Sequence, residues 1–292
     1  MILYEGLFHV LVTPFDVDGR VDAQSLRRLV EFAVGAGARG LTALGVNGEA
    51  AHLDDHERDL VLDTVLEVVG GRVPVVVGVS DPDTRVAAAR AARAAQAGAA
   101  ALMLAVPPEV DRLRSHLEVV ASAASGLDVV LQDYPASGHP RVAADVLAAA
   151  AREVSSVRAV KAEDPPTPAK IAELAGLAPN VAQLGGLGGL WLLWELRAGA
   201  RGTMTGFAFP EALAAIVADA ASGDWESARS RYVDALPALV WEAQPAVGLL
   251  LRKTLLARRG LIDTALLRAP APAVPDAAAQ AAEIAARFGR GA

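Results

Sequence analysis

Residues 101–163 have the sequence ALMLAVPPEVDRLRSHLEVVASAASGLDVVLQDYPASGHPRVAADVLAAAAREVSSVRAVKAE. This stretch contains three short apolar runs, Ala101–Val106, Asp128–Tyr134 and Val157–Glu163, separated by two longer segments rich in Ala and Leu. Short apolar runs of this kind predict buried strands, and the longer segments predict the helices that connect parallel strands. The stretch therefore indicates strand–helix units repeated along the chain.

The same alternation continues on both sides, up to about residue 222. The other predicted strands are Leu7–Val12, Gly40–Gly45, Pro74–Val79, Val181–Gly185 and Gly202–Thr205. The predicted helices are Ala23–Ala36, Asp55–Val69, Asp83–Ala97, Val110–Ser125, Ala143–Ala151, Pro168–Ala175, Gly189–Ala198 and Glu211–Ala221. Eight strand–helix units predict an α/β fold, a (β/α)8 TIM barrel.

Further helices are predicted after the barrel, at Trp225–Val240, Gln244–Arg258 and Asp276–Phe288. Because no linker separates them from the barrel, we expect a single domain over residues 1–292. In this domain residues 1–222 form the barrel and residues 223–292 form a C-terminal helical extension.

Composition excludes several classes of protein. The formal net charge is −7 and no basic patch stands out, which argues against a nucleic-acid partner. The chain has no cysteine, and its five histidines lack the spacing of a metal site, so we expect no metal. No apolar run has the ~18 residues of a membrane span, and the first residues lack the pattern of a signal peptide. We therefore expect no membrane partner and a cytoplasmic location.

Lys161 is the first candidate for catalysis, because active sites of such barrels lie at the C-terminal ends of the strands. It lies near the end of an apolar strand and is one of only three lysines in the chain. A charged amine is costly to bury, and burial favours the neutral amine that attack on a carbonyl needs. The alternative is a structural ion pair with Glu163, two residues further along the same face of the strand.

Two other strand ends carry polar or glycine-rich turns. In Gly45-Val46-Asn47-Gly48-Glu49, free backbone N–H groups between glycines have the geometry to bind a carboxylate, although glycine also serves shape alone. At the end of the fifth strand, Gln132 is a possible hydrogen-bond donor to an intermediate. Tyr134 is a possible proton relay or simply an aromatic residue at the barrel rim.

Taken together, these motifs resemble the dihydrodipicolinate synthase / N-acetylneuraminate lyase family over about residues 5–290. The resemblance rests on Thr13-Pro14-Phe15 with Asp18-Gly19, Gly45…Gly48-Glu49…Leu53, Val160-Lys161 and Gly202–Gly206. It implies that Lys161 forms a Schiff base with pyruvate or another 2-oxo acid, in a homotetramer or homodimer. It also implies a substrate-binding set of Val46, Asn47, Gly48 and Glu49 from the turn, with Gly185 and Met204 from the glycine-rich segments of strands seven and eight.

This sequence departs from the family pattern at the fifth strand. Gln132 occupies the position of the family's catalytic tyrosine, and an amide cannot act as acid or base near neutral pH. The arginine that follows the strand-five proline in the synthase is also missing, so the lysine-pathway synthase reaction is not expected. We expect Glu163 to replace the tyrosine as general base, with Tyr134 as the alternative.

The leading hypothesis is a class I lyase or aldolase that cleaves or forms a carbon–carbon bond in a 2-oxo acid, with no cofactor. Dehydration or deamination through the same imine is the first alternative. A non-catalytic barrel that binds a 2-oxo acid is the second. A sugar-phosphate aldolase is disfavoured, because the loop Gly185–Gly189 has no basic neighbour.

Overall fold

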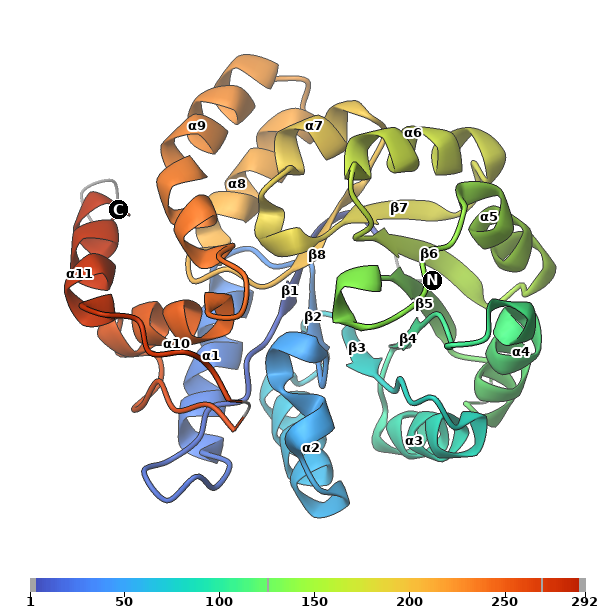
Figure 1. The fold of residues 1–292 in the computed structure, drawn as a ribbon, viewed down its shortest axis with the longest axis horizontal. Coiled ribbons are helices and arrows are strands. Elements are labelled where there is room, and N and C mark those ends of the chain that lie inside the picture. The colour runs from blue at the N-terminus through green and yellow to red at the C-terminus, as the bar shows by residue number, and fades with distance from the viewer. Residues whose placement is uncertain (1–3, 125, 269, 289–292) are drawn as a thin grey trace.

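The computed structural model describes residues 4–124, 126–268 and 270–288. Eight parallel strands pair in chain order, and β8 pairs with β1, so that the sheet closes into a barrel (Figure 1). The strands are β1 (Gly6–Val10), β2 (Gly40–Ala43), β3 (Val75–Gly78), β4 (Ala101–Ala105), β5 (Asp128–Asp133), β6 (Val157–Ala162), β7 (Ala182–Gly185) and β8 (Gly202–Thr205). The prediction of a (β/α)8 barrel is confirmed.

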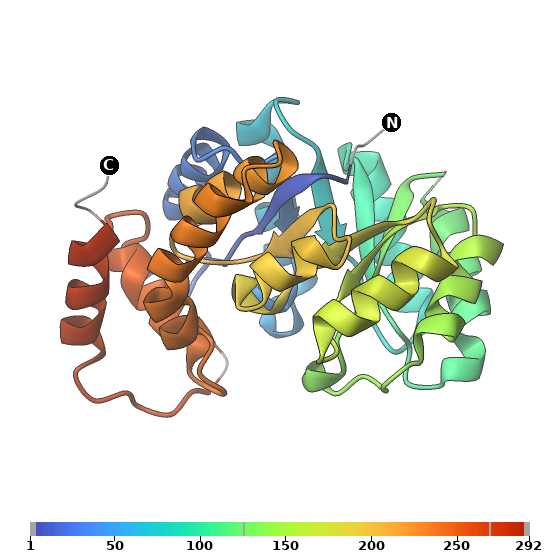
Figure 2. The same ribbon diagram turned by 90° about the horizontal axis from the view of Figure 1, so that it is seen from above.

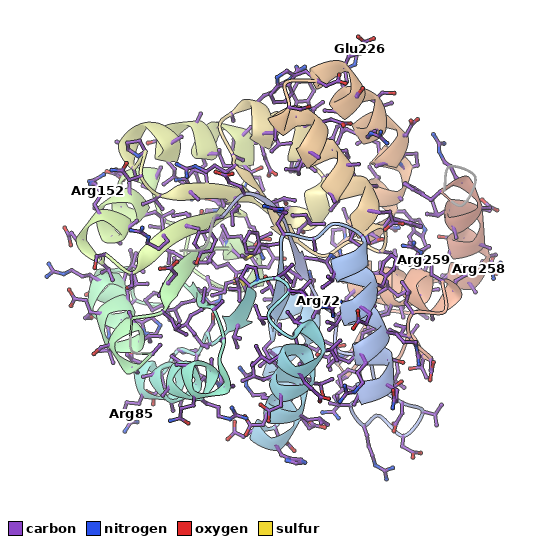
Figure 3. All side chains as sticks on the ribbon, turned by 180° about the vertical axis from the view of Figure 1, so that it is seen from behind. Arg72, Arg85, Arg152, Glu226, Arg258 and Arg259 are labelled. Carbon is purple, nitrogen blue, oxygen red and sulfur yellow. The ribbon has the colours of Figure 1, made fainter. Side chains whose placement is uncertain are left out.

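Helices surround the barrel as an outer ring (Figure 1). They are α1 (Ala23–Gly35), α2 (Asp55–Val69), α3 (Thr84–Ala97), α4 (Leu113–Ala123), α5 (Ala144–Glu153), α6 (Thr167–Leu177), α7 (Leu192–Arg197) and α8 (Pro210–Ala221). Charged side chains lie on their outer surface, as the labelled Arg85 on α3 and Arg152 on α5 show at the edge of Figure 3.

Two helices of the barrel begin three residues later than predicted. The segment expected as Val110–Ser125 starts with a 3-10 turn, Val110–Arg112, and Ser125 lies outside the described residues. The helix expected from Gly189 begins at Leu192, after the 3-10 turn Leu187–Gly189. Gly188 and Gly189 have positive φ values of 72° and 82°, which a regular right-handed helix does not accommodate.

Alternation along the strands determines which side chains enter the barrel. Phe8, Val130, Ala159 and Leu184 belong to the apolar cluster inside the barrel, separate from the larger cluster that includes the helices. Lys161 lies two residues after Ala159 on β6, so its side chain has the same inward direction. The strand pattern therefore directs Lys161 toward the barrel axis, at the C-terminal end of its strand.

Three helices follow the barrel, namely α9 (Trp225–Glu242), α10 (Gly248–Arg258) and α11 (Ala277–Phe288). They extend to one side of the barrel (Figure 2), where α9 packs on α8 and α11 packs on α10. None of the helices in the described part of the chain is both long and apolar enough to span a bilayer.

A buried ion pair joins this extension to the barrel. Lys253 on α10 is fully buried, and its Nζ lies 2.6 Å from Oε1 of Glu49, in the turn after β2. The other carboxylate oxygen of Glu49 accepts a hydrogen bond from the backbone N–H of Arg268 at 2.8 Å. Breaking a buried pair by removing one partner costs several kcal/mol, so this contact fixes α10 relative to the strand ends.

Candidate active site

A cavity of about 500 Å³ lies at the C-terminal ends of the strands. Of the residues that the sequence analysis singled out, those in its wall are Val46, Asn47, Gln132, Tyr134, Lys161 and Glu163. Its volume is within the ~300–1,000 Å³ typical of small-molecule sites. The structure thus brings together residues from the ends of strands β2, β5 and β6.

Lys161 and Glu163 form an ion pair inside this cavity. The Lys161 Nζ lies 3.2 Å from Oε2 of Glu163, and the two side chains are only 5% and 6% exposed. Glu163 is held at both oxygens, because Oε2 also accepts from Gln132 Nε2 at 2.8 Å and Oε1 accepts from the Leu187 N–H at 3.1 Å. The carboxylate is therefore fixed next to the amine, where it can accept a proton.

The loop after β7 has to contain glycine at position 186 for this arrangement to form. A Cβ at Gly186 would lie 2.4 Å from Cγ and from Oε1 of Glu163, which is far inside van der Waals contact. Leu187 and Gly188 of the same loop line the cavity. Gly186 therefore leaves the space that the Glu163 carboxylate occupies.

The structure gives Gln132 a different partner from the one expected. Sequence reasoning assigned its amide to a reaction intermediate, whereas the amide donates to Glu163. Gln132 pairs with Lys161 in the β5–β6 register, so the amide and the amine emerge side by side on neighbouring strands. Gln132 therefore orients the carboxylate and competes with Lys161 for the same oxygen.

Tyr134 is half-buried at the edge of the cavity, directly after β5. Burial raises the pKa of its phenol above the usual 10.0, and the nearby charge of Glu163 raises this pKa further. The phenol therefore keeps its proton near neutral pH, so it serves as a hydrogen-bond donor rather than as a base.

In the turn after β2, two residues line the cavity and two contact other parts of the protein. Val46 and Asn47 line the cavity, while Gly48 is buried and its carbonyl oxygen accepts from Thr13 Oγ1 at 2.7 Å. Glu49, expected to bind substrate, instead contacts Lys253 through its carboxylate. Glu49 therefore stabilises the contact between the C-terminal extension and the barrel, and it lies outside the cavity wall.

Gly185 and Met204 are likewise outside the cavity wall. A Cβ at Gly185 would lie 1.9 Å from Oε2 of Glu195, a residue of α7, so this glycine accommodates a buried side chain on the helical side. Met204 is fully buried in the apolar cluster within the barrel. Neither residue lies in the cavity wall where the sequence predicted it, although Thr205, the residue of β8 that follows Met204, does.

Sequence reasoning missed two charged residues of the cavity wall, Glu242 on α9 and Arg252 on α10. Arg252 Nε donates to Oε2 of Glu242 at 2.7 Å, and both side chains are buried. With the segment between them, these helices close one side of the cavity. No sequence signal marked Arg252, because arginine is the common basic residue of this chain and its position depends on how α10 packs.

All three lysines of the chain form ion pairs with acidic side chains. Lys161 and Lys253 have buried carboxylate partners, as described above. Lys170 Nζ lies 2.6 Å from Oδ2 of Asp133 and 3.0 Å from Oδ2 of Asp164. Each lysine thus contributes to a specific ion pair, but Lys161 is the one in the cavity wall.

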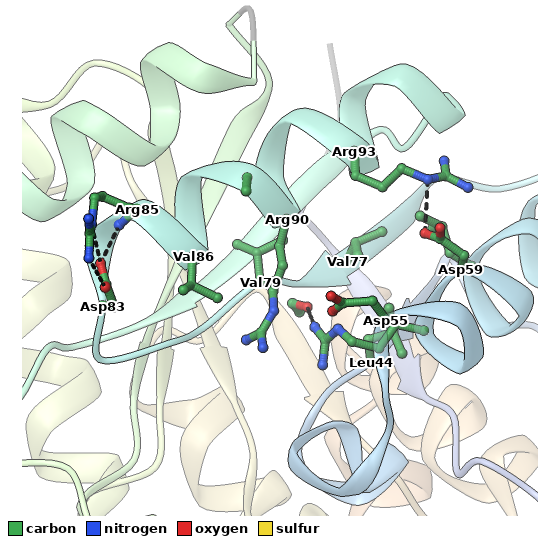
Figure 4. A pocket seen from close by; sticks show the side chains of 14 residues that line it. Leu44, Asp55, Asp59, Val77, Val79, Asp83, Arg85, Val86, Arg90 and Arg93 are labelled. Carbon is green, nitrogen blue, oxygen red and sulfur yellow. Dashed lines mark hydrogen bonds and ion pairs between the residues drawn. The ribbon is translucent and has the colours of Figure 1, made fainter.

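A second hollow, of about 490 Å³, lies between α2 and α3 (Figure 4). Three of its four arginines, Arg85, Arg90 and Arg93, form ion pairs with neighbouring acids. The fourth, Arg58, donates to the carbonyl oxygens of Ala50 and Gly78 at 2.8 and 3.2 Å. Its wall includes no lysine. Within the described residues, no group of three potential ligands is arranged to hold a metal.

Comparison with known proteins places these observations in a family. A model described as the dihydrodipicolinate synthetase family matches residues 3–286. L-2-keto-3-deoxyarabonate dehydratase from Azospirillum brasilense is 36% identical over 296 residues, covering 98% of this chain and 94% of that protein.

Solved structures agree with this match. Dihydrodipicolinate synthase from Rhodopseudomonas palustris has a TM-score of 0.91 at 32% identity, with 97% of both chains covered. A catalytic lysine mutant of sialic acid aldolase from Ruminococcus gnavus has a TM-score of 0.87 at 19% identity, covering 98% of this chain and 97% of that one. The second similarity concerns the fold alone.

Proposed function

This chain belongs to the dihydrodipicolinate synthetase family, and from that premise we propose that it forms an imine between Lys161 and the ketone of a 2-oxo acid. The observation that carries the proposal is the buried amine of Lys161, 3.2 Å from a fixed carboxylate in a cavity of substrate size. The enzyme is a lyase of this family, and the non-catalytic alternative is set aside.

We propose dehydration as the reaction, in preference to carbon–carbon cleavage. A relative that matches nearly the whole chain is a dehydratase of a 2-keto-3-deoxy sugar acid. Gln132, in the position of the family's tyrosine, supplies no proton and instead orients Glu163. One carboxylate beside the amine is suited to moving a proton between neighbouring carbon and oxygen atoms of the substrate.

The first step forms the imine. The neutral amine of Lys161 adds to the carbonyl carbon C2, and the resulting carbinolamine loses its oxygen as water to give a protonated imine. Glu163 accepts the proton that the ammonium form must release before attack and returns it to the oxygen that leaves as water, so that the carboxylate is free for the next step. The imine nitrogen then accepts an electron pair from the substrate more readily than the original ketone does.

Elimination follows from the imine. Glu163 takes a proton from C3, the C–H electron pair forms a C2=C3 double bond, and the π pair of the C=N bond moves to nitrogen, which gives an enamine. The enamine expels the hydroxyl group of C4, which leaves as water with the proton from Glu163 while Tyr134 donates a hydrogen bond to it. Hydrolysis of the remaining imine releases the unsaturated 2-oxo acid and restores Lys161.

The proposal extends to the organisation of the enzyme. The division into a barrel over 1–222 and an extension over 223–292, within one domain, is supported by a cavity wall that draws on both parts. A homotetramer or homodimer rests on the family resemblance, and a cytoplasmic location stays an expectation from the sequence. Size-exclusion chromatography with light scattering measures the oligomeric state.

Product analysis tests the reaction. A 2-keto-3-deoxy pentonic acid is incubated with the enzyme, and the products are identified by mass spectrometry and by an enzymatic assay for pyruvate. Loss of one water with every carbon retained supports dehydration, whereas release of pyruvate supports carbon–carbon cleavage. Lys161→Arg is the matched variant, since it keeps the charge beside Glu163 but provides no nucleophilic amine.

A further inference from the structure

Two acidic residues alternate with the active-site residues at the ends of β5 and β6. Asp133 lies between Gln132 and Tyr134 in the sequence, and Asp164 directly follows Glu163. Because successive side chains of an extended chain point to opposite faces, both acids point to the helical side of the barrel. Neither acid lies in the cavity wall, and Asp133 is completely buried. The outer side of these two strand ends therefore carries charge that does not face the substrate.

Lys170 on α6 contacts both acids. Its Nζ lies 2.6 Å from Oδ2 of Asp133 and 3.0 Å from Oδ2 of Asp164. It also donates to the carbonyl oxygen of Val142, just before α5, at 2.7 Å, which gives each of its three donors an acceptor. The Lys170 side chain is only 10% exposed, so water hardly competes for these contacts. One ammonium group thus joins the end of β5, the end of β6 and the segment before α5.

The buried carboxylate of Asp133 depends on this contact. Its Oδ1 has no hydrogen-bond partner in the described part of the chain, and a buried charge without a partner is costly. Asp164 is less dependent, because Nη1 of Arg141 lies 3.0 Å from its Oδ1. Lys170 is therefore the cation that stabilises Asp133, whereas Asp164 has a second one.

The strand ends that Lys170 joins also position Glu163. The backbone N–H of Glu163 donates to the carbonyl oxygen of Asp133 at 2.9 Å. On the inner side of the barrel, Gln132 Nε2 donates to Oε2 of Glu163 at 2.8 Å. A shift of β5 relative to β6 would change both distances, and a misplacement of about 1 Å in a catalytic group can lower a rate about a hundredfold. The position of the Glu163 carboxylate therefore depends on how firmly the two strand ends are held together.

We propose that Lys170 is a positioning residue, which holds the ends of β5 and β6 together from outside the barrel and so maintains the hydrogen bond from Gln132 to Glu163. For its effect on the reaction, this inference rests on the proposed role of Glu163 as the proton carrier. Lys170 lies outside the cavity wall and does not contact the substrate. Its loss therefore slows proton transfer by Glu163 and leaves substrate binding nearly unchanged.

Pyruvate in heavy water separates proton transfer from binding. In the pyruvate imine, Glu163 removes a proton from the methyl carbon, exchanges it with solvent and returns a deuteron to the enamine. The loss of the methyl signal, followed by proton NMR over a range of pyruvate concentrations, gives the maximal exchange rate and the half-saturating concentration.

The variants separate the ammonium from the stability of the fold. Lys170→Met keeps the apolar stem, Lys170→Arg restores a cation, and the double variant Asp133→Asn/Lys170→Met leaves no buried carboxylate without its cation at residue 133. Glu173→Gln is the control, because Glu173 is exposed on the same helix. Circular dichroism checks the fold of each variant, and urea titration measures its stability.

We expect the maximal exchange rate to fall about ten- to a hundredfold in Lys170→Met and in the double variant, while the half-saturating concentration changes less than about twofold. Lys170→Arg should recover part of the rate, and Glu173→Gln should behave as the wild type. The double variant should be more stable than Lys170→Met, because it contains no unpaired buried charge at residue 133. Its exchange rate should nevertheless stay low, which distinguishes positioning from stability.

Three results would overturn the inference. They are a wild-type rate in folded Lys170→Met, a rate that recovers together with stability in the double variant, and a rise in the half-saturating concentration as large as the fall in rate.

Failure of the proposed function has a different signature, because the wild-type enzyme would then neither exchange the protons of pyruvate nor be trapped with it by borohydride. In that case backbone hydrogen–deuterium exchange, measured by mass spectrometry without substrate, tests the contact. Faster exchange in the peptides that contain β5 and β6, but not in the peptide that contains β2, supports the inference for the double variant. Equal exchange in the double variant and the wild type refutes it.

Discussion

Replacing Lys253 by Met tests how the C-terminal extension is fastened to the barrel. Lys253 is completely buried and lies 2.6 Å from Glu49, whose side chain is 1% exposed. The substitution keeps the apolar stem but leaves the Glu49 carboxylate buried without its cation. Breaking a buried ion pair in this way costs about 3–5 kcal/mol of unfolding free energy. The change also loses the contact of Nζ with the Phe15 ring, 4.3 Å away.

The double variant Glu49→Gln/Lys253→Met separates charge from packing. It removes both charges, so we expect it to be more stable than Lys253→Met alone, even though it carries an additional substitution. The free energy of unfolding is measured by urea titration with tryptophan fluorescence. Arg258→Met is the control on the same helix, and as an exposed substitution it should change stability by at most about 0.5 kcal/mol. A double variant that costs the sum of the two single variants would refute the reasoning.

Three further substitutions test the site and its surroundings. Glu163→Gln should lower turnover about 10²- to 10⁴-fold with the fold intact by circular dichroism, and full turnover would remove Glu163 from the mechanism. Tyr134→Phe should lower turnover only about tenfold, as for loss of one hydrogen bond, and a loss as large as that of Glu163→Gln would make the phenol the proton carrier. Burial raises the pKa of Glu195 from 4.5 to about 8. Between these two pH values the folded protein therefore holds a proton that the unfolded chain has released. Stability from this group is therefore complete below pH 4.5 and falls by up to about 1.4 kcal/mol per pH unit until about pH 8; Glu195→Gln should flatten this slope, and an unchanged slope would contradict the assignment.

The barrel was predictable because its strands are short, apolar and separated by helical segments of regular length. Observed and predicted strands differ by at most two residues at either end, as for β2, which ends at Ala43 instead of Gly45. The same alternation placed Lys161 and Glu163 on one inward face, and the structure shows them in contact. The alternation of strand and helix patterns thus predicted the fold, and the alternation along β6 predicted the Lys161–Glu163 pair.

The remaining features of the site depend on tertiary contacts. Arg252 reaches the cavity only because α10 packs against the strand ends, and the buried pair of Glu49 with Lys253 holds it there. The role of Glu49 was mistaken for substrate binding, because a motif shows that a carboxylate is required without showing what it contacts. Gly185 was misplaced for a similar reason, since its lack of a side chain serves Glu195 on α7.

Borohydride trapping followed by peptide mapping tests the central claim most directly. The folded enzyme is incubated with pyruvate and with a 2-keto-3-deoxy sugar acid, reduced, digested and analysed by mass spectrometry. We predict an adduct on Lys161 in the wild type and none in Lys161→Arg. No adduct with either acid, or an adduct on Lys170 or Lys253 instead, would contradict the assignment of Lys161 as the imine-forming residue.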